Sequence, residues 1–271
     1  MKSTPPSIEG RRRLSPFWLQ VITIGVLVIL WEIAGRTGLI LAYKYSYPSD
    51  VLLALYDLVV DGFPNGVRAF GHVEATFTRI ILGFLLASIC AIPLGLLLGR
   101  LPFVLAMVDP LITFARSMAV ISLLPLAIAL FGVGETARVA LIFYACFWIV
   151  LSNAIQGAAQ VDPLLLNVGR SLGLTRFQLF ARVFLPAALP MIFAGMRVAV
   201  GMAFMVIVAV EMVGTVEGLG ALISQARTFY RTPIAISGMV LIGLVGFLIA
   251  VGMAFLERWL MPWSRSQERK S

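Results

Sequence analysis

Long apolar runs separated by short polar segments make up most of the chain. Six of them have about the 20 residues that an α-helix needs to cross the hydrocarbon core of a bilayer. They are residues 17–34, 80–98, 104–131, 139–161, 190–213 and 233–256. The pattern therefore predicts an all-α membrane protein with six transmembrane helices.

A secretory signal peptide is the rival interpretation of the first run. The run is long for that role, and Ala34-Gly35-Arg36 does not form a small-x-small cleavage site. We therefore interpret residues 17–35 as a spanning helix. The polar, basic and proline-containing residues 1–16 are typical of a disordered tail.

One long polar connection, residues 36–72, follows the first predicted span. Pro48 and Asp50 are typical of a helix start, Ser49 is the predicted N-cap, and Gly62 is the predicted stop. This amphipathic helix is too short to cross a bilayer. We expect it to lie on the outer membrane face or against the bundle.

The composition agrees with a membrane location. Hydrophobic residues make up 60% of the chain, charged residues 13%, and the mean hydropathy is +0.98, which excludes an ordinary soluble domain. The net charge of +8 is spread over loops, so it does not indicate nucleic-acid binding.

The distribution of positive charge predicts the orientation in the membrane. With the N-terminus inside, twelve Lys and Arg fall in inner segments and six in outer ones. The excess inside predicts that both termini and the 162–190 segment are cytoplasmic.

Chemistry of the chain's own is not expected. A nucleotide-hydrolysing P-loop needs a lysine directly after a glycine, and none of Lys2, Lys44 and Lys270 has one before it. The sequence also has no G-x-S-x-G elbow and no H-E-x-x-H helix. We therefore predict a protein without catalytic residues that is not an enzyme.

A metal site is not expected either. His72 is the only histidine, so a histidine-based zinc site has too few ligands. Cys90 and Cys146 both fall inside apolar runs, and we predict that both are free, buried thiols.

The polar segment between the fourth and fifth runs is the most unusual part of the chain. Asp162-Pro163 is typical of a helix start, and Gly173 then interrupts the helical pattern. Thr175 is the predicted cap of a second short helix, which Pro186 and Pro190 should end. Two amphipathic helices at an angle either lie on lipid, with arginines on phosphates, or provide a docking surface for another protein.

This segment resembles a motif of bacterial ABC importer permeases. Their cytoplasmic loop reads E-A-A, three residues, Gly, nine residues, Ile-x-Leu-Pro; here the same spacing gives Asn167-Val168-Gly169, Gly173 and Val183-Phe184-Leu185-Pro186. The glycine and the Leu-Pro pair match, whereas the acidic and alanine positions differ. The resemblance runs from about Tyr47 to Trp263. It is strongest to the branch associated with nitrate, taurine, alkanesulfonate and related small anions.

The resemblance implies the type I ABC importer fold in the bacterial cytoplasmic (inner) membrane. It also implies four kinds of partner: a second copy of the chain, two ABC ATPase subunits, a periplasmic or lipid-anchored substrate-binding protein, and the bilayer. ATP and magnesium would be bound by the ATPase, so no cofactor is expected on this chain. The resulting organisation is a cytoplasmic tail (1–16), a first span (17–35), a periplasmic segment (36–72), a permease core (73–260) with its coupling loop (162–189), and a cytoplasmic tail (261–271).

In the family, the cytoplasmic loop forms a coupling helix that fits a groove of the ATPase. Carried onto this sequence, the resemblance implies apolar anchors, arginines that pair with acidic rim residues, and glycines at the bend. The predicted coupling residues are Asn167, Gly169, Arg170, Leu172, Gly173, Leu174, Thr175, Arg176, Phe177 and Pro186.

Charged residues within the runs need a special environment, because a charge in hydrocarbon costs about 3 kcal/mol on insertion scales. Arg79 and Asp109 lie near span ends, where we expect their charged groups to reach the interface. Arg116 and Arg197 lie deeper. They either hold the bundle together or make a pathway positive for an anion, and the sequence leaves both open.

The resemblance also implies a pathway and an outer gate. Pro125 is predicted to break the third span, and the segment before it should line the pathway. The predicted pathway residues are Arg116, Met118, Ser122, Arg197 and Glu211. Gly218, Leu219 and Gly220 resemble the family's outer gate, although glycine content alone favours a flexible loop.

Two other functional classes remain open. A self-sufficient secondary transporter needs acidic or proton-relaying residues within the membrane, and Glu211 alone gives it thin support. A structural membrane protein would leave Arg116 and Arg197 unexplained.

Overall fold

The computed structural model describes residues 16–37 and 46–261, and these residues form helices and turns without a strand. The predicted terminal tails lie outside the described residues, apart from Pro16 and Met261. Thirteen helical segments follow one another along the described chain. They are α1 (Pro16–Arg36), α2 (Pro48–Val60), α3 (Ala69–Leu98), α4 (Pro102–Ser117), the 3₁₀ turn η1 (Val120–Leu123), α5 (Leu124–Phe131), α6 (Glu135–Ala159), α7 (Pro163–Ser171), α8 (Arg176–Leu179), the π-helical turn η2 (Phe180–Phe184), α9 (Leu185–Glu211), α10 (Leu219–Thr228) and α11 (Thr232–Leu260).

Four helices of the described chain are long and apolar enough to cross a membrane. They are Ala69–Leu98, Glu135–Ala159, Arg176–Glu211 and Thr232–Leu260. A fifth span results if α4 is counted together with η1–α5, a pair bent by 86°. The predicted first span forms α1, which is outside this set. The all-helical membrane class is thus confirmed, whereas the count of six is not reproduced exactly.

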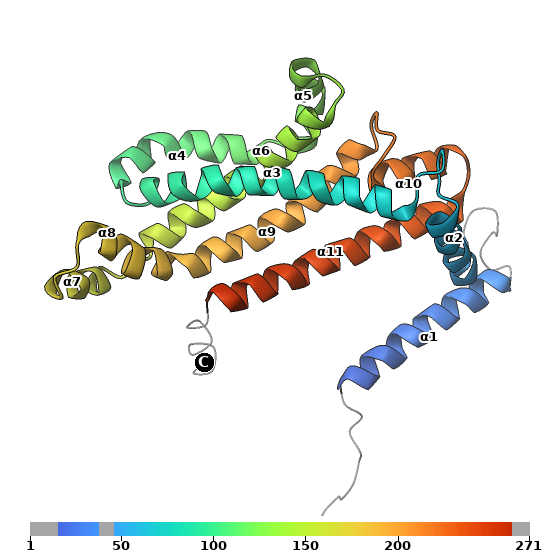
Figure 1. The fold of residues 1–271 in the computed structure, drawn as a ribbon, viewed down its shortest axis with the longest axis horizontal. Helices are drawn as coiled ribbons and strands as arrows, with labels where there is room; N and C mark the ends of the chain where they lie inside the picture. The colour runs from blue at the N-terminus through green and yellow to red at the C-terminus, as the bar shows by residue number, and fades with distance from the viewer. Residues whose placement is uncertain (1–15, 38–45, 262–271) are drawn as a thin grey trace, which may run out of the picture.

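The centre of the bundle is formed by α3, α6 and α9, which run side by side along its length (Figure 1). Ile80, Ile142, Val150 and Ile207 are fully buried between them. Small residues bring the backbones together: a Cβ added at Gly95 would lie 2.5 Å from the Cβ of Ala154. Such close contact replaces the hydrophobic driving force that helices lack inside a membrane.

The two cysteines differ in their surroundings. Cys146 is buried in this core, as predicted, but Cys90 is exposed on α3. The prediction for Cys90 was wrong because an apolar helix in a membrane turns part of its surface to lipid rather than to protein. An apolar run therefore does not tell which side chains are buried among other helices.

A second cluster packs α2 and α10 against α11 at one end of the bundle (Figure 1). Leu58, Leu219 and Leu222 are buried there. The predicted N-cap of α2 is wrong: Ser49 donates from its hydroxyl and its backbone N–H to the carboxylate of Glu32, at 2.9 and 3.2 Å. The helix already begins at Pro48, so Tyr47 is at the N-cap position and Ser49 lies within the first turn.

The bend in the predicted third span does not occur at Pro125. The helix α4 ends at Ser117, and the two following residues, Met118 and Ala119, have extended backbones. Pro125 lies in the first turn of α5, where a missing N–H is harmless. The hydroxyl of Tyr144 donates to the carbonyl of Ala115 at 2.7 Å and satisfies one of the groups that the bend exposes.

The helix that begins at Arg176 also passes through the two prolines that should have ended it. The segments α8, η2 and α9 form one helix from Arg176 to Glu211. The wide π-helical turn lies just before Pro186, where a regular turn would bring the proline ring against the carbonyl of Arg182. The widened turn removes that conflict, so the chain continues as a helix.

Candidate coupling loop, pathway face and outer polar network

The first short helix of the coupling loop forms as predicted. A carboxylate oxygen of Asp162 accepts the N–H of Leu164 at 2.7 Å, and Pro163 occupies the first turn of α7. Gly173 follows the helix with a φ of +76°, and its N–H donates to the carbonyl of Arg170 at 3.0 Å. A residue without a side chain is favoured at this left-handed position, so the bend depends on the glycine.

The second short helix begins with a complete capping box. The N–H of Gln178 donates to the hydroxyl of Thr175 at 3.3 Å, and the N–H of Thr175 donates to the side-chain oxygen of Gln178 at 3.0 Å. Two backbone donors are satisfied reciprocally. The loop therefore has a defined shape even though it lies at the end of the bundle (Figure 1).

Large apolar side chains of this loop are left uncovered. Leu172 is 75% exposed and Phe177 is 79% exposed. Gly169 is buried. A Cβ there would lie 2.5 Å from the side chain of Leu179, so the glycine lets α7 approach α8. Of the other predicted coupling residues, Asn167, Arg170, Thr175 and Arg176 are exposed, Leu174 is half-buried, and Pro186 lies in the first turn of α9.

The predicted pathway residues do not all meet in one place. Arg116 and Met118 line a cavity of about 410 Å³ beside the bend that follows α4. Aromatic and thioether side chains from α6 and α9 complete its wall, among them Tyr144, Trp148 and Met202. Ser122 does not line this cavity; its hydroxyl donates to the carbonyl of Ala119 at 2.6 Å.

Arg197 and Glu211 lie elsewhere. Arg197 forms an ion pair with Glu257 of α11, and its side chain is 55% exposed. This partner is not visible from the sequence because the two residues are 60 positions apart. Glu211 is 1% exposed and belongs to a polar network at the end of the bundle opposite the coupling loop (Figure 1).

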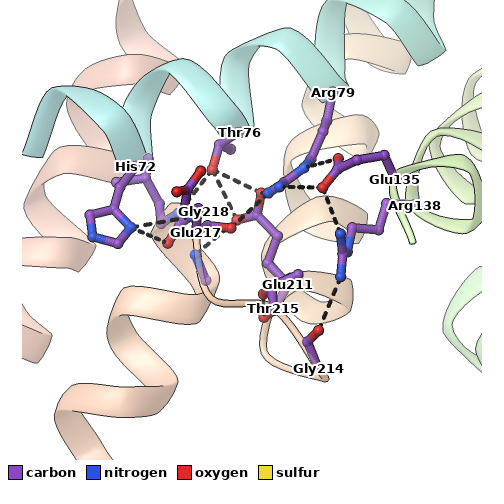
Figure 2. Close-up of polar contacts among 12 residues, drawn as sticks. His72, Thr76, Arg79, Glu135, Arg138, Glu211, Gly214, Thr215, Glu217 and Gly218 are labelled. Atoms are coloured by element: carbon purple, nitrogen blue, oxygen red, sulfur yellow. Dashed lines mark hydrogen bonds and ion pairs between the residues drawn. The ribbon is translucent and has the colours of Figure 1, made fainter. Parts of the chain in front are cut away.

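Arg79 is the centre of this network, which we call the outer polar network because it holds the predicted outer gate residue Gly218 (Figure 2). It donates two hydrogen bonds to Glu135, at 2.5 and 2.7 Å, one to Glu211 at 2.6 Å, and one to the carbonyl of Glu217 at 2.9 Å. Its side chain is buried, so the predicted position at the membrane interface is wrong. Two carboxylates on other helices replace the solvent that the side chain was expected to reach.

Arg138 joins the network from the first turn of α6. It donates to Glu135 at 2.7 Å and to the carbonyl of Gly214 at 3.1 Å. Two arginines therefore face two glutamates, which leaves these four side chains without net charge. Their contacts hold the turn after α9 against the ends of α3 and α6 (Figure 2).

The start of α10 is held by the same network. Glu211 accepts the N–H of Gly220 at 3.0 Å and the hydroxyl of Thr76 at 2.9 Å, while Thr76 accepts the N–H of Leu219 at 2.9 Å. His72, fully buried, lies with Nε2 2.8 Å from the carbonyl of Phe63 and with Nδ1 3.2 Å from the N–H of Gly218. A neutral ring that donates from Nε2 and accepts at Nδ1 satisfies both.

The predicted outer gate residues are therefore part of a built structure rather than a loose loop. Gly218 has a φ of +127°, and a Cβ there would lie 2.5 Å from the carboxyl carbon of Glu211. A sequence signal for the network exists: His72, Thr76 and Arg79 recur at spacings of four and three, which places them on one face of α3. Their partners are not visible in the sequence.

These observations define a multi-pass transmembrane subunit: an apolar helical bundle with an exposed amphipathic loop at one end and a polar closure at the other. Residues 91–266 match the family described as binding-protein-dependent transport system inner membrane component. The chain belongs to this family, and it is an ABC transporter permease.

Relatives from several bacteria support this membership. The chain is 32% identical to the taurine transport system permease protein of Escherichia coli, over 90% of this chain and 89% of that protein. It is 31% identical to a putative aliphatic sulfonates transport permease protein of Bacillus subtilis, over 96% and 92%. It is 30% identical to the nitrate import permease protein of Synechocystis, over 97% and 98%.

The fold has a solved counterpart. The structure resembles inward-facing conformations of the MetNI methionine ABC transporter, with a TM-score of 0.56 and 17% identity over 77% of this chain and 94% of that chain. The predicted type I fold is thereby confirmed.

Proposed function

We propose that this chain is the pathway-forming subunit of an ATP-driven importer for a small organic or inorganic anion. In this proposal two copies of the chain assemble with two ATPase subunits, and a binding protein delivers the substrate from outside. The observation that carries it is the coupling loop: a capped, glycine-hinged pair of short helices whose most exposed apolar side chains are Leu172 and Phe177.

The exposed pair suits a protein partner. Apolar anchors surrounded by cationic side chains are typical of a docking surface, since the anchors fill a pocket and the charges pair at its rim. Arg170 and Arg176 flank the anchors and are exposed. An ATPase groove with an acidic rim would complement this arrangement.

The helix that starts at Arg176 connects docking to transport. It runs without interruption to Glu211 and is 36 residues long. At 1.5 Å per residue this is about 54 Å, enough to cross the membrane. In our proposal ATP-driven closure of the ATPases moves α7 and α8, and the helix transmits the movement to the network that holds Gly218 and Gly220.

The coupling assignment is tested by replacing Gly173 with leucine. A β-carbon at φ +76° strains the bend, so the ATPase should dissociate or hydrolyse ATP without transport. Gly132→Leu is the matched control, because Gly132 has the same φ of +76° and open space around it at a position away from the loop. Equal retention of the ATPase by both variants, with transport-coupled hydrolysis intact, would contradict the assignment.

The anionic substrate is supported by Arg116 on the wall of the 410 Å³ cavity and by the names of the taurine, sulfonate and nitrate relatives. If its charge serves passage, Arg116→Gln should reduce uptake and leave the melting temperature unchanged. If it holds the bundle together, the melting temperature should fall first. Wild-type uptake by the Gln variant would end the pathway role, and Arg116→Lys shows whether charge alone suffices.

The proposed orientation places the coupling loop in the cytoplasm and the outer polar network outside. A cysteine at Thr175 should then react with impermeant reagents only from the cytoplasmic side, and one at Thr215 only from the outer side. The two positions lie just outside opposite ends of the helix that runs from Arg176 to Glu211. Labelling of both from one side would contradict the orientation.

Glu211 no longer favours a secondary transporter. Its carboxylate accepts hydrogen bonds from Arg79, Thr76 and Gly220. The acidic group that the sequence suggested for proton relay is therefore not free.

A further inference from the structure

A groove lies on the side of the bundle next to the coupling loop. It has a volume of about 760 Å³, which is within the range of ligand sites. Its walls are apolar side chains of α3 and α9, among them Ile92, Leu96, Leu97 and Leu185. Arg100, just beyond the end of α3, and Arg176, at the start of α8, are the charged residues that line it.

The two arginines have no acidic partner of their own. Within residues 16–37 and 46–261, neither takes part in an ion pair or a side-chain hydrogen bond. Arg100 instead stacks on Phe184, with its guanidinium carbon 4.3 Å from the ring centre. The stacking fixes the cation beside the groove and leaves its N–H donors available for an anion.

The position of the groove relative to the bilayer decides which anion fits. Most of the apolar wall belongs to the last two turns of α3, a spanning helix. Arg100 lies just beyond the end of this helix, and Arg176 begins another spanning helix, Arg176–Glu211. This is the depth at which an acyl chain gives way to a phosphate. A small water-soluble anion would contact only the arginines and leave the apolar wall uncovered. A lipid would contact the arginines through its phosphate and the apolar wall through an acyl chain.

We propose that this groove binds one anionic phospholipid. Its phosphate lies on Arg100 and Arg176, and the first part of an acyl chain lies along Ile92, Leu96 and Leu185. The lipid contacts both α3 and the beginning of the helix that carries the coupling loop. The proposal rests on the proposed function only in assigning the groove to the cytoplasmic leaflet, where anionic lipids and basic side chains attract one another.

The coupling loop can then contact a protein partner and a lipid through different side chains. Leu172 and Phe177 belong to the loop and do not line the groove, so they remain available to a protein partner. Arg176 lies at the boundary between the two surfaces. A lipid on Arg176 and an acidic ATPase residue on Arg170 can be present together.

The test is native mass spectrometry of the purified full-length permease with phosphatidylglycerol and with phosphatidylcholine of the same chains. The wild type should bind phosphatidylglycerol about tenfold more tightly, because both lipids carry a phosphate but the choline cation of phosphatidylcholine cancels the net negative charge that attracts the two arginines. Arg100→Gln should remove that preference. The control is Arg258→Gln, because Arg258 is an exposed arginine in the last turn of α11 and does not line the groove. Equal affinity for the two lipids, or equal effects of the two variants, would overturn the proposal.

A second variant tests the apolar wall without a change of charge. Leu97 is 57% exposed in the groove, and Leu97→Trp should obstruct the acyl chain and weaken the binding of both lipids. Melting temperatures of all variants show whether the fold is intact. Unchanged lipid binding by a folded Leu97→Trp protein would refute the proposed acyl position.

Other occupants give different results. Displacement of phosphatidylglycerol by millimolar inorganic phosphate would indicate a site for a free anion and overturn the lipid. Loss of the ATPase from Arg100→Gln, with lipid binding unchanged, would assign the groove to the partner protein and also overturn it. Failure of the wild type to retain an ATPase, with its lipid preference present, would refute the proposed function and leave the lipid site standing.

Discussion

Replacing Gly218 with alanine should damage the outer polar network directly. Gly218 immediately precedes α10 and has φ +127° and ψ 158°, a backbone region that residues with a side chain essentially avoid. An added Cβ would lie 2.5 Å from the carboxyl carbon of Glu211 and 2.6 Å from both of its oxygens. The methyl group and the carboxylate cannot occupy these positions together.

The cost has two parts. Backbone strain in such a region is about 1–3 kcal/mol. Displacement of the Glu211 carboxylate disrupts at least one of its bonds to Arg79, Thr76 or Gly220, and a hydrogen bond to a charged group contributes about 1.5–3 kcal/mol. We expect a loss of about 3–5 kcal/mol in the free energy of unfolding, which corresponds to a melting temperature lower by roughly 6–15 °C.

Gly132→Ala separates the two parts. Gly132 has φ +76° and ψ 177°, in the same glycine-only region, but nothing lies within 4 Å of an added Cβ. It should show the strain alone, so the melting temperature of Gly218→Ala should be lower than that of Gly132→Ala by at least about 4 °C. Thermal unfolding of both variants in the same detergent measures the difference. Equal melting temperatures would show that the contact with Glu211 does not stabilise the outer end.

Two further predictions concern the packing of α9. Arg197→Glu should lower uptake and the melting temperature, because two carboxylates then meet, and a second change of Glu257→Arg should restore the melting temperature; uptake that stays low in the thermally restored double variant would assign the charge of Arg197 to the pathway rather than to the ion pair. Gly195→Ala should cost about 1–3 kcal/mol, since an added Cβ would overlap the side chain of Asn153. Gly201→Ala, in open space on the same helix, should instead be neutral or stabilise by up to about 1 kcal/mol, and similar thermal unfolding of the two would refute the close α6–α9 contact.

The coupling loop was predictable because its structure is local. Asp162, Gly173 and Thr175 each act within three residues of their own position, and those interactions follow from residue type and spacing. The same reasoning failed at Pro186, where it treated proline as an end of the helix. The π-helical turn that accommodates the proline depends on packing around Phe184, which is buried against other helices.

The outer polar network was not predictable because its partners are remote in sequence. Arg79 meets Glu135 after 56 residues and Glu211 after 132. A single sequence shows that such charges need partners in a membrane but not which ones they find. Arg79 is therefore buried although its place near a span end predicts the membrane interface, and the flexible loop that glycine content alone favours at 218 and 220 is a turn whose glycine N–H groups are bonded.

The network explains why the outer end of an apolar bundle contains four charged side chains. Buried ion pairs contribute little net stability, because removing each charge from water costs about as much as their attraction returns. They do penalise any arrangement that separates the partners, since a lone buried charge is far less favourable. Arg79 is bonded to α6, to α9 and to the turn before α10 at once, so these three elements either stay together or separate with their charges re-solvated.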